Sequence, residues 1–394
     1  MAQSDRFQRI EEIANKHIEQ GSFSGVEWQI KRKGEVWANG RAGFSDALNQ
    51  TKMPEKPIYR IYSMTKPIIS VVALMLVEQG KLRLFDPVAA YLPEFAEMSV
   101  FNEDGSARPA KSPMIIEHLL THRAGLSYGF INDCPAGERY RSSSINKAEM
   151  PLEEVIKNIA SLPLAFEPGS WWRYSVATDV LARVIEVALD QKLPDILDEY
   201  VFKPLAMVDT GYRIAQAEQS RLMAMFGKND LDDLMNFDDK PQALVPSDMS
   251  AQHPMDSEGF YRGGYGLYST LDDYARFADF LISGMTGEGE RLLSGKMIEL
   301  MWTNRIPDNQ LPLKIGPLLL PGYGFGLAGR VMMDIGKSYG LTSLDECGWA
   351  GAASTYFWID PKEDIIGITM AQYLGSKVPI GDDIRNAVYQ ALDD

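Results

Sequence analysis

Apolar residues recur at helical spacing in the first twenty residues of the chain. Phe7, Ile10, Ile13 and Ile18 are separated by polar and charged residues, which predicts an amphipathic helix. The same charged residues interrupt the continuous apolar stretch that a signal peptide needs. A last helix is expected over about Ile380–Leu392, so the pattern predicts one helix near each end of the chain.

Strand patterns also occur towards both chain ends. Val26–Lys33 and Val36–Asn39 flank a turn at Gly34, which predicts an antiparallel hairpin. After about residue 263, two helical patterns are followed by alternating or β-rich runs. The expected helices are Leu271–Ile282 and Ser294–Met301, and the expected strands are Gly324–Met332, Cys347–Ala350, Thr355–Asp360 and Ile365–Gln372.

A dense apolar segment between the two ends predicts a helix over about Met64–Gln79 that is buried on most of its surface and is terminated by Gly80. From residue 82 to 255, strand signals are scarce and short helical patterns alternate with polar loops. The helices expected there are Asp86–Tyr91, Ile115–Thr121, Leu152–Ile159, Thr178–Ala188 and Leu193–Val201.

The simplest assembly of these elements is an α+β fold. An antiparallel sheet would be built from both chain ends and flanked by the terminal helices, with a mainly helical subdomain inserted between them. The 394 residues exceed the size at which one core usually stops growing, so the length predicts one large domain with a sizeable insertion or two packed subdomains. We expect a sheet subdomain of residues 1–81 and 256–394 and a helical subdomain of residues 82–255, with the active site between them.

Composition and charge narrow the class of partner. Hydrophobic residues make up 45% of the chain and charged residues 24%, as in ordinary globular proteins. The net charge of −15 disfavours nucleic acids and anionic membrane surfaces, so a small-molecule substrate is expected. No segment has the roughly 18 continuous apolar residues of a membrane span. The sequence leaves the oligomeric state open.

The two cysteines indicate the compartment. Cys134 and Cys347 lie far apart in sequence and form no C-x-x-C pair. Free thiols are typical of a reducing environment. Together with the missing signal peptide, they predict a cytoplasmic protein.

Candidate chemistry begins at the start of the buried helix. Ser63 and Lys66 are three residues apart, so their side chains lie on the same helix face and can meet. A serine hydroxyl is a weak nucleophile until a neighbour takes its proton, and a lysine amine can do so when burial disfavours its charged form. Taken alone, the pair has a simpler explanation as a helix-capping serine and a surface lysine.

Tyr174 and a late small-residue segment add to this pair. Tyr174 comes just before a helix whose start is indicated by Ser175 and Thr178, so its ring can project into a cleft and relay a proton. Trp171 and Trp172 also allow a plain aromatic packing cluster. The segment 348–355, GWAGAAST, permits a substrate to lie against an edge strand whose free N–H helps to bind an oxyanion, or it marks a simple sheet bend.

These three motifs, in this order, resemble the serine β-lactamase and penicillin-binding-protein superfamily, and most of all the family VIII carboxylesterases, which resemble class C β-lactamases. The segments RIYSMTKPI, LLTHRAGLSYGF, EPGSWWRYS, GGYGLYSTLDDYARF and GWAGAAST carry the resemblance. It implies a β-lactamase/transpeptidase-like fold, Ser63 as nucleophile, and Lys66 and Tyr174 as shared general base and acid. It also implies an oxyanion hole formed by the backbone N–H groups of Ser63 and Ala352.

Two departures from the β-lactamase pattern favour esters as substrates. Val176 stands where that branch has an asparagine, and Trp349 stands where it has a lysine that pairs with the substrate carboxylate. A neutral ester needs neither group, and Trp349 offers an apolar wall. Gly351 lets the substrate approach the strand. Tyr128 and Phe130 are further candidates for the pocket lining, although core packing explains them equally well.

Two other sets of residues suggest different chemistry. Gly336–Gly340 matches G-x-S-x-G, but an α/β-hydrolase needs its histidine after Ser338, and all four histidines precede it. His118 and His122 have a spacing that can bind zinc, yet no third ligand is evident. Asp232, Asp233, Asp238 and Asp239 lack the glycine and glutamate of a calcium loop.

The sequence therefore predicts a serine carboxylesterase that hydrolyses small, short-chain acyl esters through an acyl-enzyme on Ser63, with weak β-lactam hydrolysis as a side activity. No metal or organic cofactor is required for this chemistry. Three alternatives stay open: a D-peptidase or amidase of the same superfamily, an acyltransferase, and a binding protein that keeps the fold without catalysis.

Overall fold

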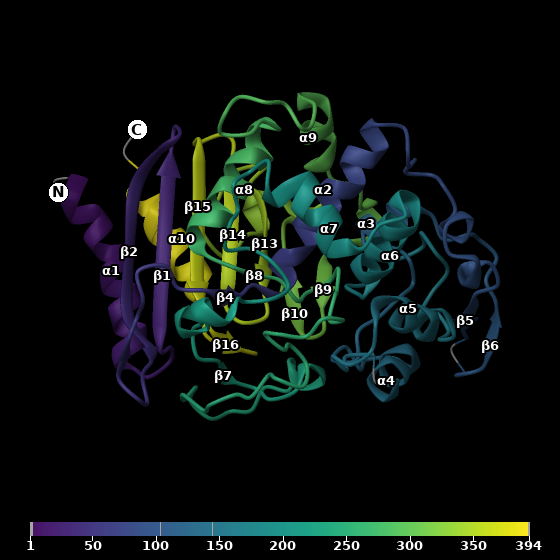
Figure 1. Ribbon diagram of the computed structural model, residues 1–394, viewed down its shortest axis with the longest axis horizontal. Coiled ribbons are helices and arrows are strands. Elements are labelled where there is room, and N and C mark those ends of the chain that lie inside the picture. Colours follow the sequence, from purple (N-terminus) through teal and green to yellow (C-terminus); the bar gives the residue numbers. More distant parts are fainter. Residues whose placement is uncertain (1–2, 103, 144, 393–394) are drawn as a thin grey trace.

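The computed structural model describes residues 3–102, 104–143 and 145–392. Its centre is an eight-stranded antiparallel sheet with the order β11-β12-β13-β14-β15-β1-β2-β3 (Figure 1). β1 pairs with β15, so Val26 lies opposite Ala371 and the two chain ends share one sheet. The strands are β1 Gly25–Arg32, β2 Glu35–Asp46, β3 Thr51–Lys52, β11 Tyr323–Phe325, β12 Arg330–Met332, β13 Cys347–Gly351, β14 Thr355–Asp360 and β15 Ile365–Ala371.

Helices cover both faces of this sheet. The terminal helices α1 (Gln3–Glu19) and α10 (Ile380–Gln390) pack on one face, where Trp28 and Trp358 are buried in the shared core. The helices α2 (Thr65–Glu78) and α8 (Leu271–Ser283) contribute to the core on the other face. The predicted fold class, a sheet built from both chain ends and flanked by the terminal helices, is confirmed.

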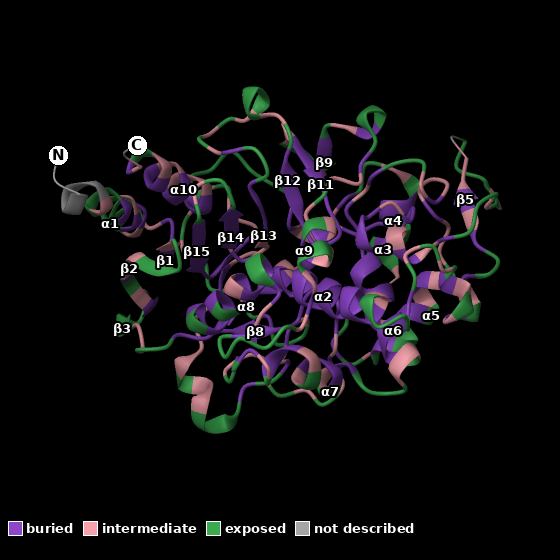
Figure 2. Ribbon diagram, turned by 90° about the horizontal axis from the view of Figure 1, so that it is seen from above, coloured by how far each residue is buried: buried purple, intermediate pink, exposed green. Residues whose placement is uncertain are grey.

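Helix α2 lies at the centre of the larger core, as Figure 2 shows. Every residue from Thr65 to Leu76 is buried. A helix that is apolar all round can only be stable when other elements surround it, and α2 contacts helices α6, α7 and α9. This burial fixes the position of the turn that precedes α2.

Short helices joined by long loops make up most of the chain between the two halves of the sheet, and β5 (Ser99–Phe101) and β6 (Ala107–Pro109) form a small hairpin in it. The proposed subdomain boundaries remain a prediction. The helices are α3 Ile116–Leu120, α4 Pro135–Ser142, α5 Leu152–Ala160, α6 Ala177–Leu189 and α7 Leu193–Leu197, with α9 Gly295–Met301 after α8. The remaining short strands are β4 Tyr59–Arg60, β7 Phe226–Gly227, β8 Tyr268–Ser269, β9 Leu313–Ile315, β10 Leu318–Leu320 and β16 Tyr373–Leu374.

Some predicted elements differ from the structure. The single strand expected over 324–332 is wrong, because the chain turns between β11 and β12 with the Gly326 N–H donating to Gly329 O at 2.8 Å. The helix expected over 86–91 is only a 3-10 turn at Val88–Ala90, because Pro87 is extended with ψ of 133°. The helix expected over 193–201 ends at Leu197 and continues as a π-helical turn.

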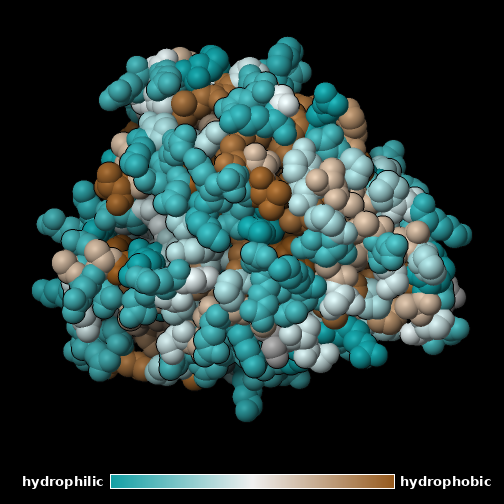
Figure 3. All heavy atoms as spheres, turned by 45° about the vertical axis from the view of Figure 1, so that its right-hand side comes forward, coloured by the Kyte–Doolittle hydropathy of each residue, from teal (hydrophilic) through white to brown (hydrophobic). Residues whose placement is uncertain are grey.

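The surface is mostly polar, and the two cysteines are not bonded to each other. Hydrophilic residues cover most of the face in Figure 3, with a few hydrophobic groups near its centre. Cys134 and Cys347 are both free. Within the described residues, no helix combines the length and apolar character needed to cross a membrane.

Candidate active site

Ser63 lies in a strained turn at the entrance to α2. The 3-10 turn Tyr62–Met64 precedes the helix, and Tyr62 has φ of 43°, a left-handed conformation that is costly for a bulky residue. The Tyr62 ring is held by edge contact with His253 at 5.1 Å and by stacking on Tyr265 at 6.5 Å between ring centroids. Packing therefore maintains the strain and keeps Ser63 half-buried at the wall of a cavity.

Lys66 lies one helical turn after Ser63 and is only 3% exposed. Its Nζ is 3.2 Å from Ser63 Oγ, 2.9 Å from Tyr128 OH and 2.7 Å from the carbonyl oxygen of Gly264. The structure thus brings together the two side chains that the S-x-x-K spacing places on one face. Hydrogen-bond partners in three separate segments of the chain therefore fix the direction in which the Lys66 amine points.

Tyr174 lies beside this lysine in the loop before α6. Its ring centroid is 4.7 Å from Lys66 Nζ, and its hydroxyl accepts a hydrogen bond from Trp349 Nε1 at 3.3 Å. The ring also packs against His122 and Tyr128, with centroid distances of 4.7 and 5.4 Å. Tyr174 therefore lines the cavity with its ring close to the Lys66 amine, and Tyr128 is the tyrosine whose hydroxyl accepts a hydrogen bond from that amine.

The contact of Lys66 with Tyr128 and Gly264 was missed from the sequence. Gly264 links the lysine to a buried carboxyl group, because its N–H donates to Asp179 Oδ1 at 3.0 Å. A Cβ at this position would lie 2.6 Å from Asp179 Oδ2 and 2.7 Å from Tyr128 OH, so a larger residue would displace the Asp179 carboxyl or the Tyr128 hydroxyl. The two glycines of the segment GGYG indicate that other groups come close to the backbone there. No local pattern indicates which groups these are.

Burial controls the protonation of the groups around Lys66. It raises the pKa of the Asp179 carboxyl, against the opposing effect of the Gly264 N–H and the Lys66 amine. It also raises the pKa of Tyr128 well above its usual value, so this residue stays a neutral phenol. Burial and the nearby Lys66 hold the pKa of His122 well below its usual value, so its ring is neutral.

The edge of β13 completes the cavity wall. β12 pairs with β13 only at Cys347 and Gly348, which leaves the edge from Trp349 onwards unpaired by β12. Within the described chain, the backbone N–H groups of Ser63 and Ala352 have no hydrogen-bond acceptor. Two free N–H groups at one cavity have the character of an oxyanion hole.

The cavity has a volume of about 330 Å³. Its wall includes seven residues selected from the sequence: Ser63, Tyr128, Phe130, Tyr174, Trp349, Gly351 and Ala352. Apolar side chains that were not selected extend it: Leu231, Leu234, Met235, Ile315, Leu318 and Leu320. Val176 does not line it, because this residue is the buried N-cap of α6 and its N–H bonds to Ser127 O at 3.3 Å.

None of the competing candidates is among the described residues that line the cavity. Ser338 is part of a local turn in which its hydroxyl donates to Gly340 O at 2.8 Å, and it does not line the cavity. His118 accepts the Ile115 N–H at 3.4 Å, whereas His122 contacts Ser175 Oγ at 3.3 Å. Among the described residues, no cluster of three or more metal-ligating side chains is found.

Comparisons with known proteins agree with this geometry. Residues 10–391 match the family model for Beta-lactamase. The chain belongs to the Beta-lactamase family. Esterase EstB of Burkholderia gladioli is 27% identical over 401 residues, covering 97% of this chain and 94% of EstB. An uncharacterised protein of Mycobacterium tuberculosis is 32% identical over 361 residues, covering 90% of this chain and 86% of that protein.

A solved structure supports the fold. The protein described as "EstCE1, a hydrolase with promiscuous acyltransferase activity" superposes with a TM-score of 0.82 at 24% identity, covering 98% of this chain and 99% of that one. The predicted family and fold class are therefore confirmed. The family and its named members support a serine hydrolase or acyltransferase, and most directly a carboxylic ester hydrolase.

Proposed function

We propose that the protein is a serine carboxylesterase that hydrolyses small, short-chain acyl esters through an acyl-enzyme on Ser63. The observation that carries this proposal is the 3.2 Å contact between Ser63 Oγ and the buried Lys66 Nζ, at the wall of a largely apolar cavity. A buried amine beside a hydroxyl is the arrangement that activates a weak nucleophile. The esterase activity of EstB supports the same reaction.

The reaction proceeds in two halves. Ser63 Oγ attacks the ester carbonyl while its proton passes to Lys66, and the negative charge that develops on the carbonyl oxygen is held by the N–H groups of Ser63 and Ala352. The tetrahedral intermediate expels the alcohol, to which Tyr174 gives a proton drawn from Lys66. Water then attacks the acyl-enzyme by the same proton path, and Ser63 is regenerated together with the free acid.

Trp349 and the apolar lining favour an ester over an anionic lactam. Trp349 stands in the wall beside Tyr174, where a β-lactamase-type site is expected to carry a lysine. The lining side chains that residues 231–235 and 315–320 contribute are all apolar: Leu231, Leu234, Met235, Ile315, Leu318 and Leu320. Such a surface gains most from an acyl chain or an alkyl alcohol, so weak β-lactam hydrolysis is proposed only as a side activity.

The test is hydrolysis of p-nitrophenyl butyrate by the wild type, Ser63→Ala and Ser338→Ala. We expect turnover by the wild type and by Ser338→Ala, because Ser338 lies in a separate turn, and none by Ser63→Ala. Full activity of Ser63→Ala would show that the nucleophile is misassigned. If all three proteins are inactive on esters, a D-amino-acid peptide screen decides whether the chain is a peptidase or a non-catalytic binding protein.

Acyl transfer is a second candidate activity. Acyltransferase calJ of Penicillium decumbens is 25% identical over 360 residues, covering 84% of this chain. An acyl-enzyme in an apolar cavity can be intercepted by an alcohol when water is disfavoured. Adding short alcohols to the butyrate assay and measuring the new ester against free butyrate gives the partition between transfer and hydrolysis.

A further inference from the structure

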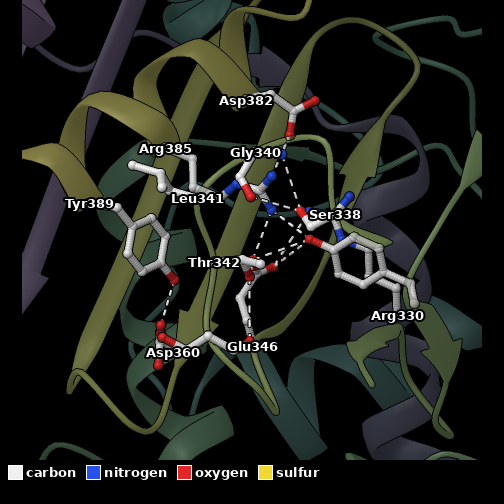
Figure 4. A network of polar contacts seen from close by, with 12 residues as sticks. Arg330, Ser338, Gly340, Leu341, Thr342, Glu346, Asp360, Asp382, Arg385 and Tyr389 are labelled. Atoms are coloured by element: carbon white, nitrogen blue, oxygen red, sulfur yellow. Dashed lines mark hydrogen bonds and ion pairs between the residues drawn. The ribbon is translucent and has the colours of Figure 1, made fainter. Parts of the chain in front are cut away.

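Arg330 is a buried guanidinium at the wall of the candidate active site. It lies on β12, and its Cζ is 4.5 Å from the ring centroid of Tyr323 and 5.0 Å from that of Tyr356. Only 7% of the residue is exposed. Its position between two aromatic rings fixes the plane of the guanidinium, and Figure 4 shows it beside the polar network that reaches α10.

The neighbouring carboxylates are bound to another arginine. The Glu346 carboxylate accepts hydrogen bonds from Arg385 Nη1 at 2.8 Å, Thr342 Oγ1 at 2.6 Å and Tyr323 OH at 3.2 Å. Its distance to Arg330 Nη2 is 3.6 Å. The distance to Arg330 is longer than a hydrogen bond. Asp382 is also paired with Arg385, at 3.2 Å. Among the described residues of this network, Arg330 is thus the cation whose nearest carboxylate, Glu346, lies beyond hydrogen-bond distance.

The hydrogen-bonding capacity of Arg330 is mostly unused within the described residues. A guanidinium has five N–H donors, and here one is donated, from Nη2 to Tyr356 OH. The Nε–H group is buried and has no hydrogen-bond acceptor. The Nη1 N–H groups also have no acceptor, but they are accessible to solvent. Unpaired buried donors are costly, so this site favours an acceptor that enters from the cavity.

The cavity gives such an acceptor access. Arg330, Tyr356 and Asp382 line the same cavity as Ser63. Arg330 is the only basic side chain in that lining as the structure describes it, and most of the remaining wall is apolar. Away from Ser63 and the two free N–H groups, Arg330 is therefore the place in this lining where a negative charge on a bound ligand is stabilised.

We propose that Arg330 binds a carboxylate carried by the substrate, so that the preferred substrates are esters with a second, free carboxyl group. This inference rests on the proposed ester hydrolysis at Ser63 and names its substrate class. The planar carboxylate matches the guanidinium edge, and a bond between charged partners is stronger than one between neutral groups. The cation that is absent at Trp349 is thus provided by the neighbouring strand.

The test compares acid and amide forms of the same ester. In the acyl series the substrates are p-nitrophenyl hydrogen adipate and p-nitrophenyl adipamate, corrected for spontaneous hydrolysis. In the alcohol series they are the acetates of 4-hydroxybutyrate and 4-hydroxybutyramide. We expect the wild type to prefer the acid in one series by about 10- to 100-fold in kcat/KM, the effect of a charge-assisted hydrogen bond. The series with the preference shows which half of the ester faces Arg330.

Variants connect this preference to Arg330. Arg330→Gln should bring the acid-to-amide ratio close to one, and Arg330→Lys should keep part of it because the charge remains. Arg183→Gln is the control, since Arg183 pairs with Glu153 and Glu186 and does not line the cavity; it should leave the ratio unchanged. If Arg330→Gln does not fold, competitive inhibition of the wild type by free adipate, with adipamide as control, replaces it.

Two results would overturn the inference. One is a wild type without acid preference in either series, which would mean that water alone satisfies Arg330. The other is an acid preference that survives in Arg330→Gln. Both differ from failure of the proposed function, in which no ester is hydrolysed or Ser63→Ala remains active.

Discussion

Replacing Tyr128 by phenylalanine removes one of three hydrogen-bond partners that direct the Lys66 amine. The partners lie at 2.9 Å (Tyr128 OH), 3.2 Å (Ser63 Oγ) and 2.7 Å (Gly264 O). Because burial keeps Tyr128 a neutral phenol, it orients the amine and does not accept the serine proton. Tyr128→Phe therefore leaves the proposed nucleophile and base in place but loosens their geometry.

The size of the effect follows from the positive charge that the Lys66 amine gains as it takes the serine proton. A hydrogen bond to a charged group contributes about 1.5–3 kcal/mol, and a loss of about 1.4 kcal/mol in transition-state stabilisation is a tenfold loss of rate. We therefore expect kcat for p-nitrophenyl butyrate to fall by about 10- to 100-fold. KM should change much less, because the aromatic ring of the cavity wall is retained.

The control is Tyr268→Phe. Tyr268 is fully buried and its hydroxyl donates to His253 O at 3.0 Å, but it does not line the cavity. The Tyr268→Phe variant should be less stable, because a buried hydrogen bond is lost, but its kcat should match that of the wild type. A Tyr128→Phe enzyme within twofold of the wild type, or a Tyr268→Phe enzyme that loses as much, would refute the positioning role of Tyr128.

Three further variants test other contacts. Trp349→Phe removes the hydrogen bond to the Tyr174 hydroxyl but keeps an aromatic side chain in the cavity wall. We expect kcat for p-nitrophenyl butyrate to fall by about 2- to 10-fold. Gly351→Ala places a Cβ 2.4 Å from Ile61 O, just before the nucleophile turn, so both Tm and activity should fall. Burial raises the pKa of Glu27 from 4.5 to about 7, so the folded protein holds this proton more tightly than the unfolded chain. The stability gained in this way is lost as the pH rises from 4.5 to about 7. Urea unfolding should therefore show Glu27→Gln more stable than wild type above pH 7, on the order of 3 kcal/mol, with little difference at pH 4.5.

Local sequence spacing was enough to place Ser63 beside Lys66. Ser63 and Lys66 are three residues apart at a helix start, and helix geometry alone brings them onto one face. The sheet was also predictable, because alternating strand patterns near both ends have to share one core. Local patterns also selected Tyr174 and the segment 348–355, the resemblance then implied their roles, and the structure places both at the same cavity.

The remaining partners depend on tertiary packing. Tyr128 and Gly264 reach Lys66 from 62 and 198 residues away, and no local pattern specifies such contacts. Val176 was selected by its place in a motif, but the start of α6 takes it into the core. Arg330 was not selected, because the run that contains it predicted one strand where the chain forms a hairpin. Turn geometry thus decided whether this side chain reaches the cavity.

The most direct test of the central claim is intact-mass spectrometry after rapid acid quenching during turnover of p-nitrophenyl butyrate. We expect a mass increase equal to one butyryl group, mapped by peptide digestion to the segment that contains Ser63, and its absence in Ser63→Ala. A Lys66→Ala variant should form the adduct much more slowly. An adduct on Ser338, or equal labelling of wild type and Ser63→Ala, would contradict the account.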